Sequence, residues 1–173
     1  LGEVVDARRE IPGWNLPGFD DSSWKKSIPA KIVLGPLQAQ AAPPIRVTQT
    51  LRPEAITEPK PGVFLVDFGR NFAGWVRVRA QGNAGTRIVL THGELVHEDG
   101  TLNARTAAAG QIKAVPGKGG PGAPTDAFRR DEYILKGDGD ETFEPLFGFH
   151  GFRYVQVEGY PGRPAADDFL GMR

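Results

Sequence analysis

Residues 75–80 read Trp-Val-Arg-Val-Arg-Ala, and this stretch decides the fold class. Apolar residues alternate there with Arg77 and Arg79, which is the pattern of a strand with one buried and one solvated face. The turn-forming run Gly-Asn-Ala-Gly follows at 82–85, and a second apolar run, rich in β-branched residues, follows at 86–91. Residues 74–95 are therefore predicted to form a β-hairpin.

Strand-like patterns recur on both sides of this predicted hairpin. Residues 63–66, Val-Phe-Leu-Val, follow a Pro-Gly pair, and residues 131–136 end at a turn rich in Gly and Asp. No long helical periodicity survives between the Gly and Pro residues, and no alternation of strands with helices suggests a parallel sheet. The chain is predicted to be all-β, an antiparallel β-sandwich of the jelly-roll or concanavalin-like kind.

The last strand pattern, residues 152–158, predicts part of the core. Its alternation places Phe152 and Tyr154 on one face and Val155 on the other. The Gly69–Gly74 segment reads as a turn in which Asn71 tolerates a positive φ. The core is predicted to contain these side chains: Phe64, Val66, Phe68, Trp75, Val78, Ile88, Leu90, Ile134, Leu135, Phe143, Phe152 and Tyr154.

Two stretches depart from the strand pattern. Residues 1–42 hold two of the three tryptophans in an irregular Pro/Gly context, and Ala-Ala-Pro-Pro at 41–44 marks a predicted junction. Residues 104–130 are rich in Ala and then in Gly and Pro, which predicts a long exposed loop. The expected organisation is an irregular N-terminal extension at 1–42 and a β-sandwich domain at 43–173.

Composition argues against several functional classes. The 173 residues carry 21 Lys+Arg and 21 Asp+Glu, without the basic excess that a nucleic-acid binder is expected to show. The absence of cysteine removes disulfides, thiol nucleophiles and cysteine-ligated zinc. No apolar run reaches the roughly 20 residues of a membrane-spanning helix, so no membrane partner is expected. Neither a signal peptide nor an initiator Met is visible, which suggests a piece of a longer protein and leaves a cytoplasmic or exported location open.

Catalytic and histidine-based metal sites are not favoured by the sequence. Glycoside hydrolysis requires two carboxylates that face each other, and nothing in the sequence pairs the available acids. Zinc binding by His92, His97 and His150 is an alternative, but packed, hydrogen-bonded histidines are favoured. The serines do not stand in a nucleophile motif. The available acids are Asp67, Glu94, Glu98, Asp99 and Glu144.

Carbohydrate binding is the main alternative to a structural role. An exposed aromatic ring can stack on a sugar while polar side chains bind its hydroxyls. The candidate carbohydrate-binding residues are Trp14, Asp20, Asp21, Trp24, Arg70 and Asn71, with Trp75 as a further stacking candidate that is expected in the core. Asp20 and Asp21 are also possible calcium ligands, although turn and capping hydrogen bonds are the favoured role for them. No cofactor is expected, with calcium as the alternative.

Several segments, taken in order, resemble bacterial α-L-rhamnosidases. Residues 2–8, 12–14 and 18–24 resemble the end of the N-terminal domain of these enzymes. Five further segments resemble the next β-sandwich of the family, namely residues 43–47, 66–75, 92–95, 99–102 and 150–155. Arg70 stands where the family usually has Gln.

The resemblance implies a multi-domain parent that hydrolyses rhamnosides with inversion in a separate (α/α) barrel. The catalytic motifs of that barrel are absent from these 173 residues. The resemblance therefore implies a non-catalytic accessory β-sandwich that contacts the barrel and helps to shape the substrate approach. It also implies that residues 1–42 are the tail of a preceding β domain. The alternative is a free-standing module, calcium-dependent or not, that binds rhamnose-containing glycans.

Overall fold

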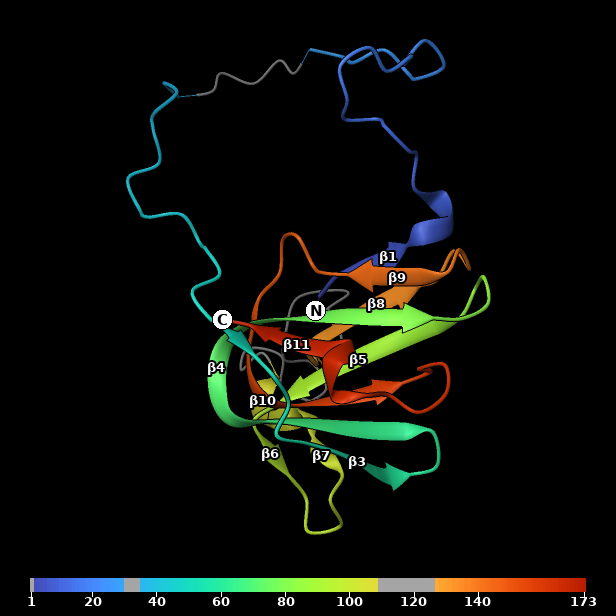
Figure 1. Cartoon of the computed structure of the whole chain (residues 1–173). Helices are drawn as coiled ribbons and strands as arrows, with labels where there is room; N and C mark the ends of the chain where they lie inside the picture. The colour runs from blue at the N-terminus through green and yellow to red at the C-terminus, as the bar shows by residue number, and fades with distance from the viewer. Residues whose placement is uncertain (1, 30–34, 109–126) are drawn as a thin grey trace, which may run out of the picture. The chain divides into compact units, whose positions relative to one another are not determined.

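The computed structural model describes residues 2–29, 35–108 and 127–173, and it divides the chain into two compact units. One unit comprises Leu1–Arg8 together with Val47–Arg173, and the other is Arg9–Arg46. The first unit is a β-sandwich, which confirms the predicted all-β class (Figure 1). No helix of the described residues is long and apolar enough to cross a membrane.

The sandwich consists of two sheets that share strand β4 (Val63–Gln81). In the first sheet, the N-terminal half of β4 lies between β3 (Ala55–Lys60) and β10 (His150–Glu158). Beyond β10 the sheet continues with β5 (Arg87–Gly93), then β8 (Arg130–Ile134), and ends at β1 (Val4–Asp6). The second sheet joins the C-terminal half of β4 to β9 (Asp140–Phe143) and to β11 (Phe169–Met172), which pairs with β2 (Thr50–Leu51).

Shorter elements complete this arrangement. Strands β6 (Leu95–Val96) and β7 (Leu102–Asn103) form a separate two-stranded sheet. The described residues also contain three short 3₁₀ turns, η1 (Ala7–Arg9), η2 (Ala104–Ala107) and η3 (Ala166–Asp168). Among the strand pairs of the described residues, β1–β8 is parallel and the others are antiparallel. Residues 4–6, predicted as part of the irregular extension, thus form β1, which lies at one edge of the first sheet.

Strand β4 curves sharply between its two halves (Figure 1). The stretch predicted as a turn at 69–74 is continuous strand, and no described residue other than glycine has a positive φ, so Asn71 does not take that role. The residue with a positive φ in this stretch is Gly69, at +76°. Gly74 is required for a different reason, because a Cβ there would collide with the carbonyl oxygen of Met172 on β11.

The predicted hairpin at 74–95 is wrong. The two predicted strands exist, but β4 and β5 are not neighbours in either sheet. Residues 75–81 of β4 pair with β11 and β9 in the second sheet, whereas β5 lies between β10 and β8 in the first. The turn at 82–85 therefore connects two layers. A local turn signal does not determine which strand a segment pairs with, because pairing depends on residues far away in the sequence.

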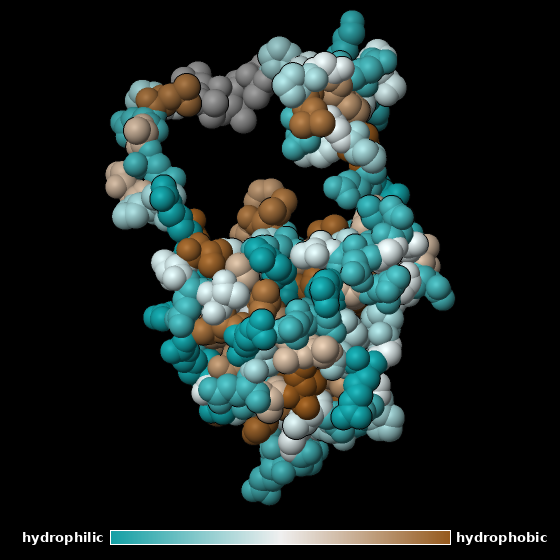
Figure 2. Space-filling model, in the orientation of Figure 1, coloured by the Kyte–Doolittle hydropathy of each residue, from teal (hydrophilic) through white to brown (hydrophobic). Residues whose placement is uncertain are grey.

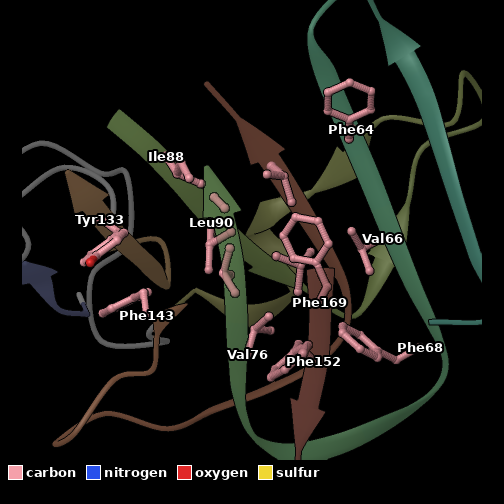
Figure 3. Close-up of a cluster of buried hydrophobic side chains, with 14 of the residues drawn as sticks. Phe64, Val66, Phe68, Val76, Ile88, Leu90, Tyr133, Phe143, Phe152 and Phe169 are labelled. Atoms are coloured by element: carbon pink, nitrogen blue, oxygen red, sulfur yellow. The ribbon is translucent and has the colours of Figure 1, made fainter. Parts of the chain in front are cut away.

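The core lies between the two sheets and contains side chains of both. Figure 3 shows Phe64, Val66 and Phe68 of β4 together with Phe152 and Phe169, which belong to β10 and β11. Nine of the predicted core residues are buried: Phe64, Val66, Phe68, Val78, Ile88, Leu90, Leu135, Phe143 and Phe152. Trp75, Ile134 and Tyr154 are only half-buried.

Two of these three differences have a clear cause. Trp75 lies on the same face of β4 as Arg77 and Arg79, because strand side chains alternate and Val76 and Val78 are the buried ones. Tyr154 follows a register shift in β10 between Phe152 and Tyr154. Such a bulge reverses the alternation after it, so Val155 and Val157 are buried where Tyr154 and Gln156 would otherwise be.

The Arg9–Arg46 unit has no strand among its described residues, and none of these residues is buried. Trp24 packs against Phe19 with ring centroids 5.5 Å apart. The Asp20 carboxylate accepts the Ser22 backbone N–H at 3.0 Å, which is the turn role that the sequence favours for it. Most of the predicted exposed loop at 104–130 lies outside the described residues, and Ala127 near its end is buried.

Candidate functional site: an apolar loop and a buried His–Asp–His cluster

Residues 146–149, Leu-Phe-Gly-Phe, connect β9 to β10 and form an exposed loop, called here the apolar loop. Leu146 is 82% exposed, Phe147 91% and Phe149 55%. Figure 2 shows hydrophobic side chains projecting where Figure 1 draws this orange connection. Large apolar side chains that cluster in the solvent mark a contact surface more often than scattered single ones do.

The Glu3 carboxylate holds the backbone of the apolar loop. Its Oε2 accepts the Leu146 N–H at 3.0 Å, and its Oε1 accepts the N–H groups of Phe147 and Gly148 at 2.6 Å each. Hydrogen bonds to an ionised acceptor are shorter and stronger than neutral ones. Because Glu3 directly precedes β1, the edge strand of the first sheet fixes the position of this carboxylate.

Beneath the loop lies an open cavity of about 330 Å³. It is lined by Gly2, Glu3, Arg129, Phe147, Gly148, Phe149 and His150. Its carboxylate, Glu3, is occupied by three backbone N–H groups of the loop. The cavity therefore does not present the pair of free carboxylates that glycoside hydrolysis requires.

His150, at the floor of this cavity, belongs to a buried His–Asp–His cluster of His92, Asp131 and His150. Three neighbouring strands supply the residues, because β5, β8 and β10 are adjacent in the first sheet. His150 Nε2 lies 3.0 Å from Asp131 Oδ2, and His92 Nε2 lies 3.8 Å from the same oxygen. The other carboxylate oxygen, Oδ1, accepts the Glu3 backbone N–H at 2.9 Å.

The cluster is electrostatically unusual because its side chains are almost completely buried. Burial, together with the nearby charge of His150, lowers the pKa of His92 to about 3, so its ring is neutral. Burial alone would raise the pKa of Asp131. The hydrogen bond with His150, together with the Glu3 backbone N–H, outweighs burial and lowers that pKa, so Asp131 is ionised.

The predicted carbohydrate-binding residues fall in both units. Trp14, Asp20, Asp21 and Trp24 belong to Arg9–Arg46, whereas Arg70 and Asn71 lie at the bend of β4. Trp14 is 56% exposed and Trp24 is 46% exposed. Binding of sugar or calcium by this set stays a prediction.

Three of the five acids considered for catalysis have structural partners. Asp67 forms a bidentate pair with Arg153 at 2.8 and 2.9 Å, and Glu144 accepts hydrogen bonds from Trp75 and Arg77 at 2.7 Å each. Asp99 caps the β6–β7 turn through Thr101. Glu94 is half-buried and Glu98 exposed.

Sequence reasoning found the histidines of the cluster but missed Asp131 and Glu3. The alternative three-histidine zinc site is not assembled, since His92 and His150 lie together while the exposed His97 sits in the β6–β7 turn. Asp131 reads as the polar start of a strand, and no local signal shows that it is buried. Glu3 lies more than 140 residues from its loop partners, so only the fold reveals that contact.

Comparison with known families gives two adjacent matches along the chain. Residues 57–173 match the bacterial alpha-L-rhamnosidase concanavalin-like domain, and residues 1–49 match the alpha-L-rhamnosidase N-terminal domain. The sandwich match agrees with the β-sandwich seen here.

Individual relatives cover almost the whole chain. An alpha-L-rhamnosidase of Streptomyces avermitilis is 42% identical over an alignment of 179 positions, which covers 98% of this chain and 15% of that protein. The alpha-L-rhamnosidase structure from Dictyoglumus thermophilum aligns with a TM-score of 0.82 at 42% identity, over 98% of this chain and 17% of that one. A Streptomyces avermitilis alpha-L-rhamnosidase structure, complexed with L-rhamnose, aligns with a TM-score of 0.81 at 40% identity, over 98% and 15%. The chain thus spans about one sixth of these relatives.

Proposed function

The chain belongs to the bacterial α-L-rhamnosidase family, and we propose that it serves in such an enzyme as a non-catalytic β-sandwich that packs on the catalytic barrel. In this role it supports the barrel and helps to shape the approach of a rhamnoside substrate. The short length relative to its relatives supports an accessory role, since most of each relative lies outside the matched part.

The apolar loop is the observation that carries this proposal. Burying one Leu or Phe side chain contributes about 1.5–3 kcal/mol, so leaving Leu146, Phe147 and Phe149 in water forgoes a large stabilisation. A partner that covers the loop would bury these side chains and so gain this stabilisation. Buried aromatic anchors are also the residues that dominate the energy of protein interfaces.

The Glu3 contacts make the loop suited to docking. Ordering a flexible loop on binding costs conformational free energy, which weakens the association. Three hydrogen bonds to one carboxylate hold the backbone of 146–148 before any partner arrives. The loop is therefore presented as a preorganised contact.

The test is reassembly of the enzyme from two polypeptides, this chain and the remainder of its parent rhamnosidase. We expect the chain alone not to cleave a chromogenic α-L-rhamnoside, and we expect it to bind the remainder. The Leu146→Ser/Phe147→Ser double variant should bind at least tenfold more weakly, since two desolvated anchors are lost. Leu95→Ser is the matched control, because Leu95 is 60% exposed but lies on β6.

Hydrolysis by the isolated chain would contradict the non-catalytic assignment. Equal binding by the double variant and by Leu95→Ser would show that the apolar loop is not the contact. Unfolding of the double variant is not expected, since both side chains are more than four-fifths exposed. Circular dichroism of the free variants checks this point.

Carbohydrate binding is the second candidate function, and the exposed Trp14 supports it. A ring that is 56% exposed can stack on the apolar face of a pyranose. The Asp20 carboxylate already accepts a hydrogen bond from Ser22, and Trp24 is packed on Phe19, so both have local structural roles. A calcium-dependent module in this segment is therefore the weaker of the two proposals.

A further inference from the structure

His92 carries a buried ring nitrogen without a hydrogen-bond partner. Its Nδ1 lies 3.4 Å from the Arg129 carbonyl oxygen, which can only accept, so Nδ1 carries the ring proton. Nε2 is then an unprotonated acceptor, has no hydrogen-bond partner and lies 3.8 Å from the Asp131 Oδ2 carboxylate oxygen. Two acceptors placed together in a dry interior repel each other, and a cation between them would remove this cost.

Outside the His–Asp–His cluster, the other buried polar side chains in the described part of the sandwich do not share this defect. The buried Glu141 accepts backbone N–H groups from Lys136 and Gly137 and the hydroxyl of Tyr133, at 2.8–3.1 Å. Among the described residues, the buried side-chain atoms without a partner are His92 Nε2 and His150 Nδ1. Both belong to the same cluster, so the deficit is local and points to something that the cluster binds.

We propose that His92, Asp131 and His150 form a binding site for one divalent transition-metal ion of the kind that imidazole prefers, such as zinc. The three potential ligand atoms lie within 4.8 Å of one another. A tetrahedral zinc site with bonds of about 2.0–2.1 Å spaces its ligand atoms by about 3.3 Å. Binding therefore requires the side chains to close on the ion by an ångström or so, while the strands that carry them stay paired.

The surroundings of the cluster match those of metal ligands. A ligating histidine usually donates its second ring N–H to a carbonyl, as His92 Nδ1 does to Arg129. Asp131 likewise keeps one oxygen for the Glu3 N–H and directs the other toward the histidines. Two nitrogens and one carboxylate oxygen leave a fourth coordination position for water, and the cavity lined by His150 gives access from the solvent.

The ion would act structurally. It would tie β5, β8 and β10 together at the end of the first sheet. Asp131 also holds Glu3, and Glu3 holds the apolar loop, so the ion would stiffen the loop that we propose as the docking contact. The metal site itself does not depend on that docking role.

The experiment titrates the chelator-stripped chain with Co²⁺ and with Zn²⁺. We expect one ion per chain, a visible Co²⁺ absorption typical of low coordination number, and a rise of the melting temperature by several degrees at saturating Zn²⁺, because an ion bound only to the folded state stabilises it. His92→Gln and His150→Gln should each weaken binding at least tenfold. His97→Gln is the matched control, since His97 is exposed and outside the cluster.

Wild-type chain that takes up neither ion would overturn the proposal, and this measurement needs no variant. Uptake that survives in His92→Gln and His150→Gln but disappears in His97→Gln would overturn it as well. If a glutamine variant does not fold, Asp131→Asn replaces it, because it keeps the shape and the acceptor for the Glu3 N–H. These outcomes are read on the chain alone, apart from association with a barrel.

Discussion

The sandwich and the Arg9–Arg46 segment both contain large aromatic side chains, but only the sandwich buries them. Phe152 has no exposed surface and contacts Phe68, Phe72 and His92 at centroid distances of 5.9, 4.5 and 4.7 Å. In the segment, Trp14 remains 56% exposed. Aromatic content alone does not create a core. Strands do, because they place apolar side chains on one face and a second sheet covers that face.

The largest expected effect is that of Phe152→Ala, which tests whether the sandwich behaves as one packed core. Removing a fully buried Phe costs about 3–5 kcal/mol of unfolding free energy, since transfer and cavity terms add. Trp14→Ala should change it by less than about 0.5 kcal/mol. Urea denaturation of both variants checks the contrast. Equal losses would show that the segment is packed as firmly as the sandwich.

The next effect is expected at the bend of β4. A side chain at Gly74 meets the Met172 carbonyl oxygen, so Gly74→Ala should cost about 1–3 kcal/mol through overpacking and displacement of β11. Gly151→Ala is the control on the neighbouring strand, because the nearest atom to its added Cβ is 3.8 Å away. Gly35→Ala in the segment, with open space around it, should also be neutral. Thermal denaturation ranks the three, and a neutral Gly74→Ala would refute the close approach.

These two contrasts also show what the sequence can and cannot predict. The alternation at 75–80 correctly predicts a half-buried strand, and the family resemblance is confirmed. The pairing of that strand is not predictable from the turn at 82–85, because its partners, β9 and β11, come from the last quarter of the chain. The alternation of β10 fails after Phe152 because a bulge inserts one residue, and no local signal marks it.

The candidate site was harder to predict than the fold for the same physical reason. His92, Asp131 and His150 are distant in sequence and meet because their three strands are adjacent. Asp131 looks like an ordinary polar strand end, and only its burial gives it a role. By contrast, the turn role favoured for Asp20 involves Ser22 two residues away, and such local contacts are readable from sequence.

A smaller effect, dependent on pH, is expected for the Asp67–Arg153 pair. Hydrogen bonding from Arg153 lowers the pKa of Asp67, with a further N–H bond from Gly69. This stabilisation is fully present above the pKa of Asp67 in the unfolded chain, about 4, and is lost as the pH falls through the lower pKa of the folded state. Asp67→Asn should therefore cost about 1–2 kcal/mol at pH 7 and progressively less below pH 4.

Asp20→Asn provides the comparison for this pair in the segment. The pKa of Asp20 is also lowered, by the Ser22 backbone N–H, but its carboxylate is exposed and serves a local turn. Its replacement should leave the melting temperature of the sandwich unchanged at every pH. Melting curves from pH 7 to pH 2 for both variants separate the two cases. A difference between wild type and Asp67→Asn that does not shrink in acid would refute the ion-pair explanation.

The smallest expected effect is the heat of mixing with L-rhamnose, which decides what the exposed tryptophans of the segment are for. A sugar site requires an exposed ring and polar groups that converge beside it. Asp20 is engaged with Ser22 and Trp24 with Phe19, and Arg70 and Asn71 belong to the other unit. We therefore expect isothermal titration of the chain to give flat heats with and without calcium. Saturable binding that is abolished both by a chelator and by Trp14→Ala would instead make the Arg9–Arg46 segment a calcium-dependent lectin site. The aromatic side chains of the segment would then be exposed because they bind sugar, and not merely because no sheet covers them.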